Sequence, residues 1–184
     1  MAILASIRHH RFLAILLLLL TVGPAARAQP SPEYKLKAVF LYNFAQFVDW
    51  PTNAFAETNS PLVIGVLGKD PFGKILDETI AGERIKNRPL EIRRFNKASE
   101  VTDCHVLFVS SSHSQEAAGL KGKGVLTVGD APDFIEHGGM IRFFTEKNKL
   151  RFAINLEAAK ADKLAISAKL LQLAEIVSLG HGPK

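Results

Sequence analysis

Three serines followed by a histidine, Ser110 to His113, are the first residues whose types suggest chemistry. A serine hydroxyl becomes a nucleophile when an imidazole accepts its proton, so this stretch is compatible with hydrolysis. The surrounding sequence has no G-x-S-x-G elbow, and the members of a catalytic triad meet in space rather than along the chain. Serines at the start of a helix also serve as caps. Hydrolysis through Ser112 and His113 is therefore our third hypothesis, and we expect a protein that is not an enzyme.

Glycines between a predicted strand and a predicted helix invite comparison with phosphate-binding loops. Gly65, Gly68 and Gly73 do not fit the spacing of G-x-G-x-x-G, and no Lys-Ser/Thr pair follows them as a P-loop requires. Asp70 and Pro71 instead suit the start of the next helix. We expect a structural turn here and no nucleotide cofactor.

The sequence has no histidines or cysteines at the spacing that is typical of metal ligands. The histidines after residue 28 are His105, His113, His137 and His181, and they form no H-x₃-H pair. His105 precedes an apolar run and is expected to be a hydrogen-bonded core histidine. Cys104 is the single cysteine; we expect a buried small hydrophobe, with a redox-active or intermolecular thiol as the alternative.

The elements that must position these residues alternate along the middle of the chain. Short apolar runs separated by helices are typical of parallel strands covered on both faces. The expected strands are 62–67, 90–95, 105–110 and 125–128, and the expected helices are 71–79, 115–120 and 132–136.

The pattern changes after residue 139. Residues 140–146 and 149–155 predict an antiparallel hairpin that turns at Lys147-Asn148. On the second strand, Arg151 and Asn155 lie on the face opposite the large apolar residues. A final amphipathic helix is expected from Ser167 to about residue 177. The sequence thus predicts an α/β fold: one three-layer sandwich with a mostly parallel sheet and a C-terminal antiparallel hairpin.

The N-terminal residues have the pattern of a secretory signal. Basic residues precede an apolar stretch over 12–22, and Ala26-Arg27-Ala28 supplies a small-x-small cleavage pattern. We expect a signal peptide over 1–28, cleavage between Ala28 and Gln29, and a periplasmic location. The expected organisation is then a short leader (29–33), an α/β domain (34–179) and a flexible tail (180–184).

The charge of the exported part argues against nucleic acid as a partner. Residues 1–28 hold three of the 23 basic residues and none of the acidic ones, which leaves 20 basic against 18 acidic residues and a formal charge of +2. A basic cluster in the middle of the chain has two interpretations: a solvated strand edge, or a contact for an acidic partner or an anionic lipid. The cluster comprises Arg84, Lys86, Arg88, Arg93, Arg94 and Lys97.

The first predicted helix carries more aromatic residues than one sheet face needs. Leu36, Phe40, Phe44 and Phe47 recur at helical spacing, and further apolar residues widen the stripe. Packing on the sheet explains most of them. The remainder favours an interaction protein, because Tyr and Trp are typical interface anchors.

Two hypotheses of function follow for a non-enzymatic protein. The first is a partner-binding module, with contacts at Tyr42, Phe47 and Trp50 near the first helix and at Arg151 and Asn155 on the hairpin. The second is a small-ligand sensor with a pocket at the carboxyl ends of the parallel strands, near Gly68, Ser110 and Asp130.

Several ordered stretches resemble the YfiR family of periplasmic proteins. They are KAVFLYNFAQFVDWP (37–51), VIGVLG (63–68), CHVLFV (104–109), LTVG (126–129), GGMI (138–141), NKLRFAIN (148–155) and SAKLL (167–171). The resemblance spans about residues 34–177.

This resemblance implies an α/β sandwich with a mixed sheet and a specific role. The family's name-giving member represses a membrane-bound diguanylate cyclase by holding its periplasmic region inactive, until an outer-membrane lipoprotein sequesters it. Similar domains are also fused to sensor kinases. The implied function is a non-enzymatic regulator of cyclic-di-GMP signalling, and hence of biofilm formation. The implied partner is the periplasmic region of a cyclase or sensor kinase. Whether the protein also forms a homodimer is left open. That member carries disulfides, whereas Cys104 alone cannot form one within the chain, so redox-tuned repression is not expected.

Overall fold

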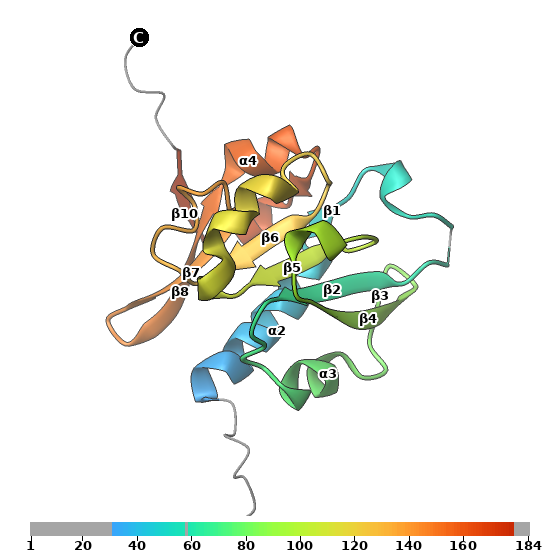
Figure 1. Ribbon diagram of the computed structural model, residues 1–184, viewed down its shortest axis with the longest axis horizontal. Coiled ribbons are helices and arrows are strands. Elements are labelled where there is room, and N and C mark those ends of the chain that lie inside the picture. Colours follow the sequence, from blue (N-terminus) through green and yellow to red (C-terminus); the bar gives the residue numbers. More distant parts are fainter. Residues whose placement is uncertain (1–30, 58, 179–184) are drawn as a thin grey trace, which may run out of the picture.

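The computed structural model describes residues 31–57 and 59–178, which form a main sheet with helices on both faces and a separate two-stranded sheet (Figure 1). The expected signal peptide, its cleavage site and the tail at 180–184 lie outside the described residues. The helices are α2 (Pro32–Gln46), α3 (Lys74–Ile80), α4 (Leu156–Ala161) and α5 (Ala168–Leu171), with 3₁₀ segments η1 (Thr52–Ala54), η2 (Ala98–Glu100) and η3 (Ser111–Leu120). The strands are β1 (Val48–Asp49), β2 (Leu62–Leu67), β3 (Arg84–Ile85), β4 (Arg88–Phe95), β5 (Val106–Val109), β6 (Leu126–Gly129), β7 (Ile141–Glu146), β8 (Lys149–Asn155), β9 (Ala165–Ile166) and β10 (Glu175–Val177). Within those ranges, no helix is both long enough and apolar enough to cross a membrane.

The main sheet has eight strands in the order β10-β8-β7-β6-β5-β2-β4-β3. The strands from β4 to β7 are mutually parallel, while β3 and β8 run antiparallel to their hairpin partners. The predicted mostly parallel sheet with a C-terminal antiparallel hairpin is confirmed. Taken in chain order, the five parallel strands are arranged 2-1-3-4-5, the doubly wound order in which ligands bind at the carboxyl ends of the first and third strands.

Two apolar cores lie on opposite faces of this sheet because successive side chains of a strand alternate. In β2, Ile64 and Val66 belong to the core under α2 and α3, whereas Val63 and Leu67 belong to the core under η3. The strand is buried along its whole length, as its unbroken apolar sequence predicts.

Helix α2 packs on the sheet through a cluster of phenylalanines. The Phe44 ring lies 5.6 Å from Phe143 and 5.1 Å from Phe152, between ring centroids. Ser31 occupies the predicted cap position, yet its side chain makes no capping bond; its carbonyl accepts from the backbone N–H of Tyr34 instead. The helix ends at Gln46, before the predicted Asp49-Trp50-Pro51 stop, because Val48 and Asp49 pair with β9.

The predicted hairpin turn is confirmed, and the structure adds a second turn of the same type. Lys147 and Asn148 have φ values of 47° and 60°, as a two-residue turn with both residues left-handed requires. Lys86 and Asn87 repeat this geometry, with φ values of 49° and 65°, between β3 and β4. No sequence pattern predicted a hairpin there.

Two predicted helices are wrong. The C-terminal helix was expected from Ser167 to about residue 177, but α5 is a single turn and residues 175–177 form β10. Ile176 pairs in register beside Ile154, so ladder bonds to β8 replace the helical ones. The expected helix at 132–136 is a series of turns, in which Phe134 packs so closely on Gly129 and Gly139 that neither position has room for a Cβ atom.

Candidate interaction surface

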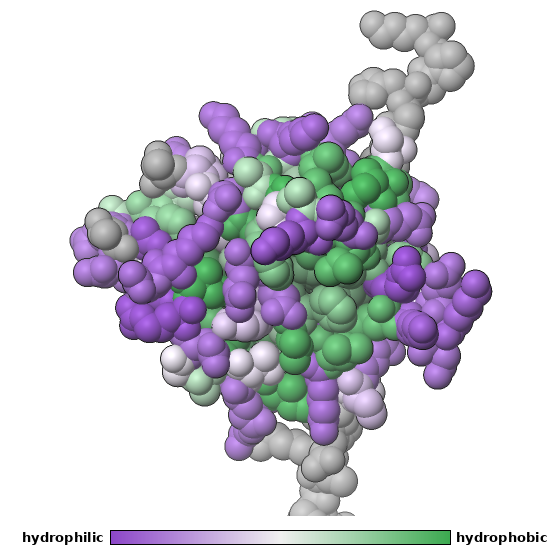
Figure 2. Space-filling model, turned by 180° about the vertical axis from the view of Figure 1, so that it is seen from behind, coloured by the Kyte–Doolittle hydropathy of each residue, from purple (hydrophilic) through white to green (hydrophobic). Residues whose placement is uncertain are grey.

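Large apolar side chains are exposed on the side of the sheet that bears α2. Leu36 and Val39 of α2 are 46% and 44% exposed, and Leu173 and Ile176 near the C-terminus are 66% and 50% exposed. We call these four residues the apolar face. Figure 2 shows hydrophobic residues gathered over the middle of this side, within a border of hydrophilic ones. Large apolar groups exposed together on one side of a domain are typical of an interaction site.

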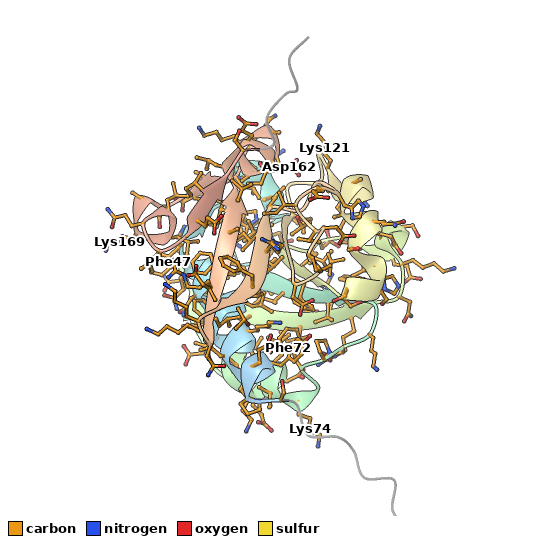
Figure 3. All side chains as sticks on the ribbon, turned by 90° about the vertical axis from the view of Figure 1, so that its left-hand side faces the viewer. Phe47, Phe72, Lys74, Lys121, Asp162 and Lys169 are labelled. Carbon is orange, nitrogen blue, oxygen red and sulfur yellow. The ribbon has the colours of Figure 1, made fainter. Side chains whose placement is uncertain are left out.

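Half-buried residues connect the two parts of the apolar face to one core. Phe40 lies 5.6 Å from Phe152 between ring centroids, and Leu150 and Leu171 pack on the same core. The backbone N–H of Ser167 donates to the carbonyl of Phe47 at 2.9 Å, which fixes α5 beside the end of α2. Figure 3 shows Phe47 and Lys169 on the same flank of the molecule accordingly.

The predicted position of Leu36 in the buried stripe of the first helix is wrong. The buried residues are Lys37, Ala38, Leu41, Phe44 and Ala45. The apolar arc was correctly recognised as wider than one sheet face consumes, but periodicity alone did not show which edge of the arc stays outside. The exposure of Leu173 and Ile176 was missed because both were assigned to a helix.

Tyr42 lies on the flank of α2 that faces α3. Its hydroxyl donates to the carboxylate of Glu83 at 2.9 Å in an exposed setting. Burial and the Glu83 carboxylate both raise the pKa of Tyr42. The phenol is therefore protonated at neutral pH and accessible, which is compatible with the predicted contact role without testing it.

Trp50 belongs to a small aromatic box at the exit of α2. Its ring lies edge-on to His105 at 5.8 Å between centroids, and the Phe55 ring stacks on the same imidazole at 4.3 Å. The Arg88 guanidinium caps the Phe55 ring at 3.7 Å from its centroid. The buried Nε1–H of Trp50 has no hydrogen-bond partner within the described chain, and the residue lines a cavity of about 280 Å³.

The two predicted hairpin contacts have different environments. Arg151 is exposed, with its guanidinium 3.9 Å from the Glu146 carboxylate. Asn155 is 4% exposed, and its side-chain oxygen accepts from the backbone N–H of Ala158 at the N-terminus of α4. Asn155 is thus a buried helix cap, and we do not include it in the proposed surface.

The carboxyl edge of the parallel sheet holds a polar cluster around Asp130. Its carboxylate accepts from Lys37 Nζ at 2.7 Å, from the Tyr34 hydroxyl at 2.8 Å and from the Ser111 hydroxyl at 2.8 Å. Burial alone raises the pKa of Asp130, but these bonds outweigh it and hold that pKa below its usual value. The first turns of α2 therefore occupy the crevice in which the second hypothesis placed a ligand.

The Ser–His stretch forms a local hydrogen-bond cluster within η3. Ser112 Oγ lies 2.9 Å and Ser110 Oγ 3.2 Å from His113 Nδ1, and His113 Nε2 lies 3.9 Å from a Glu116 carboxylate oxygen. A Cβ atom at Gly68 would lie 2.3 Å from His113 Nδ1, so the end of β2 packs directly against the imidazole. A substrate carbonyl has no room on that side, and the cluster has the geometry of a packed turn.

His105 and Cys104 occupy the core as predicted. His105 Nδ1 accepts from the Val63 backbone N–H at 3.1 Å, and Nε2 donates to the Ala54 carbonyl at 3.2 Å. Burial lowers the pKa of His105, so its imidazole is neutral at pH 7. Burial raises the pKa of the Cys104 thiol to about 12. Among the residues that the structure describes, no group of three His, Cys, Asp or Glu side chains is placed to hold a metal ion.

Most of the basic cluster is engaged within the protein. Arg94 binds the carboxylates of Asp70 at 2.8 Å and Asp77 at 2.6 Å. Lys86 pairs with Asp49, and Arg88 donates to backbone carbonyls. These contacts favour the structural interpretation of the cluster over that of an anionic docking patch.

Comparison with known protein families identifies the family of this chain. A family model described as YfiR/HmsC-like matches residues 34–175, which is well over half of the 184-residue chain. No curated protein matches the sequence.

Proposed function

The chain belongs to the YfiR/HmsC-like family, and from this premise we propose that it is a periplasmic, non-enzymatic regulator that binds and represses the extracytoplasmic part of a membrane diguanylate cyclase or a related sensor. The quantity that this regulation changes is the intracellular level of cyclic-di-GMP. The signal-peptide pattern in residues 1–28 supports export to the periplasm.

The apolar face is the observation that carries this proposal. Four large apolar side chains on one side of a small domain lose water-exposed area when a partner covers them, and that burial is worth roughly 25 cal/mol per Å². Phe47 and Tyr42 border this surface on α2 and supply an aromatic and a hydroxyl-bearing contact. Trp50 extends it toward the aromatic box, where its half-buried ring lines a cavity.

Repression follows from differential affinity. A signalling enzyme with an active and an inactive arrangement shifts toward the one that the regulator binds more tightly, and by no more than the ratio of the two affinities. The regulator needs no chemistry of its own for this role. The polar clusters at Asp130 and His113 then serve the fold rather than catalysis.

The test is the intracellular cyclic-di-GMP level in a strain that lacks the gene. We expect a rise that the exported wild-type protein reverses and that the Leu36→Glu or Leu173→Glu variant does not reverse. Ala81→Glu places the same charge on an exposed alanine at the end of α3 and is expected to complement fully. No change in cyclic-di-GMP on deletion would contradict the proposed output, and full complementation by both apolar-face variants would contradict the proposed surface.

A further inference from the structure

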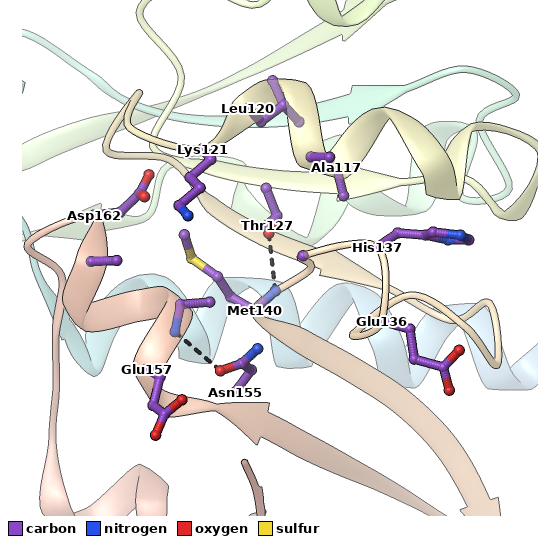
Figure 4. A pocket seen from close by; sticks show the side chains of 14 residues that line it. Ala117, Leu120, Lys121, Thr127, Glu136, His137, Met140, Asn155, Glu157 and Asp162 are labelled. Atoms are coloured by element: carbon purple, nitrogen blue, oxygen red, sulfur yellow. Dashed lines mark hydrogen bonds between the residues drawn. The ribbon is translucent and has the colours of Figure 1, made fainter. Parts of the chain in front are cut away.

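A cavity of about 610 Å³ opens on the η3 side of the sheet, away from the apolar face. Its walls are the end of η3, the turn at residues 136–138 and helix α4 (Figure 4). Apolar side chains make up much of the lining, among them Ala117, Leu120, Met140 and Ala158. This volume lies within the range of about 300–1,000 Å³ that small-molecule sites occupy.

The cavity exists because two central strands separate early. The ladder between β6 and β7 has only two pairs, Val128 with Ile141 and Gly129 with Arg142. Before these pairs, the Thr127 hydroxyl oxygen accepts from the Met140 backbone N–H at 3.1 Å in place of a strand-to-strand bond. The sheet therefore leaves an opening at the start of β7, and α4 covers only one side of it.

Two buried polar side chains present donors to this space. Asn155 is 4% exposed, and its oxygen is committed to Ala158 N–H; its Nδ2 has no hydrogen-bond partner within residues 31–57 and 59–178 and points into the cavity (Figure 4). Thr127 is 2% exposed, and because its oxygen already accepts from Met140, its hydroxyl proton is left to donate. An occupant that accepts hydrogen bonds at this inner end satisfies both groups.

The charges around the mouth disfavour an anion. Both oxygens of the buried Asp162 carboxylate accept from the backbone N–H groups of Gly122 and Gly124, at 2.9–3.1 Å, which fixes the loop that carries Lys121 (Figures 3 and 4). Lys121 directs its ammonium toward the cavity, but three carboxylates, Asp162, Glu136 and Glu157, also line it. The net negative charge at the mouth repels a carboxylate ligand. A cationic head group finds hydrogen-bond donors, not acceptors, at the inner end of the cavity.

We propose that this cavity is a binding site for a small uncharged molecule with an apolar body and a carbonyl acceptor, such as an amide, which accepts from Asn155 Nδ2 and the Thr127 hydroxyl. The site is independent of the apolar face.

Three probes with one skeleton and different head groups test the inference: 3-phenylpropanamide, 3-phenylpropanoate and 3-phenylpropylamine. Methyl NMR of Met140 and Ala117 reports binding inside the cavity. We expect saturable shifts with the amide and at least tenfold weaker binding of the other two. No shift of these methyl groups with the amide, or equal or tighter binding of either charged probe, would overturn the proposal.

Two variants connect the probe to the site. Asn155→Asp keeps the capping oxygen and the side-chain size but removes the donor, so amide affinity should fall about tenfold and the amine should become the preferred probe. Ala161→Trp places a ring at an exposed position on the rim and should abolish binding, whereas Ala165→Trp, exposed but outside the lining, should not. Unchanged amide affinity in both Asn155→Asp and Ala161→Trp would refute the assignment, and a thermal melt confirms that each variant is folded.

Discussion

Lys37 Nζ lies 2.7 Å from Asp130 Oδ2 and joins the first turns of α2 to the carboxyl edge of the parallel sheet. The lysine is 3% exposed and also pairs with Glu33, one helical turn earlier, at 2.7 Å. An ammonium buried to this extent is stable only because carboxylates surround it.

Removing this ammonium should destabilise the fold strongly. Lys37→Met leaves the Asp130 carboxylate buried with two hydroxyl donors and no cation, and we expect a loss of about 3 kcal/mol in the free energy of unfolding, measured with urea. Lys35→Met, exposed on the same helix, should change stability by less than about 0.5 kcal/mol. Adding Asp130→Asn to Lys37→Met should recover part of the loss; equal stability of the Lys37 and Lys35 variants would contradict the interpretation.

Asp130 should also contribute to acid sensitivity. Because its pKa is lower in the folded state than its ordinary value, the carboxylate contributes stability above the unfolded-state pKa of about 3.9, and this contribution is lost as the pH falls through the folded-state pKa. The free energy of unfolding of the wild type should therefore fall more steeply below pH 4 than that of Asp130→Asn. Parallel curves for the two proteins would show that Asp130 titrates alike in both states.

His105 should make the protein less stable as the pH falls below neutrality. Burial lowers its folded-state pKa, so the unfolded chain binds a proton first, and stability that is complete above the unfolded-state pKa of about 6.5 decreases below it. An NMR titration should place the midpoint of the His105 ring below the ordinary imidazole value. The free energy of unfolding should depend less steeply on pH between 7.5 and 5.5 for His105→Asn than for the wild type, and equal slopes would contradict the prediction.

The Cys104 thiol should be inert in the native protein. A shift of the pKa from 9.0 to about 12 reduces the thiolate fraction at pH 8 roughly 1,000-fold, and burial blocks the reagent as well. We expect slow reaction with a disulfide reagent such as DTNB in native buffer and rapid reaction in guanidinium. Rapid labelling of the native protein would support the alternative of a reactive thiol.

The hairpin turn offers a stabilising substitution. Lys147 has a φ of 47°, a left-handed conformation that costs a non-glycine residue roughly 1 kcal/mol. Lys147→Gly removes this cost but gives the unfolded chain more conformational freedom, so the free energy of unfolding should rise by up to about 0.5 kcal/mol. Lys149→Gly, two residues later in β8, should lower it, because glycine weakens a strand. A loss of stability in Lys147→Gly would show that the turn relaxes in solution.

Stability measurements should separate the apolar face from the core. Leu173→Glu and Leu36→Glu should unfold within about 0.5 kcal/mol of the wild type, because both side chains are exposed. Phe44→Ala, which removes a fully buried ring, should cost about 3–5 kcal/mol. A large loss in Leu36→Glu would return that residue to the core and weaken the proposed surface.

Much of this fold could be predicted from local patterns. Unbroken apolar runs identified β2, β5 and β6, since a strand buried on both faces needs apolar residues throughout. The Lys147-Asn148 turn was predicted from a different local pattern, because its position follows from two flanking strands of alternating character. The turn at Lys86-Asn87 was not predicted, because β3 is only two residues long and gives no periodic signal.

The sequence by itself determined the mostly parallel sheet, the hairpin, the buried roles of Cys104 and His105, and the family resemblance, because each depends on neighbouring residues or on ordered motifs. Only the tertiary structure decided which edge of the α2 apolar arc stays outside, that residues 175–177 pair with β8 rather than form a helix, and that Lys37 reaches Asp130 across 93 residues. The cavity beside Asn155 likewise arises where β6 and β7 part. These features depend on contacts between distant segments, whose free energies no local pattern encodes.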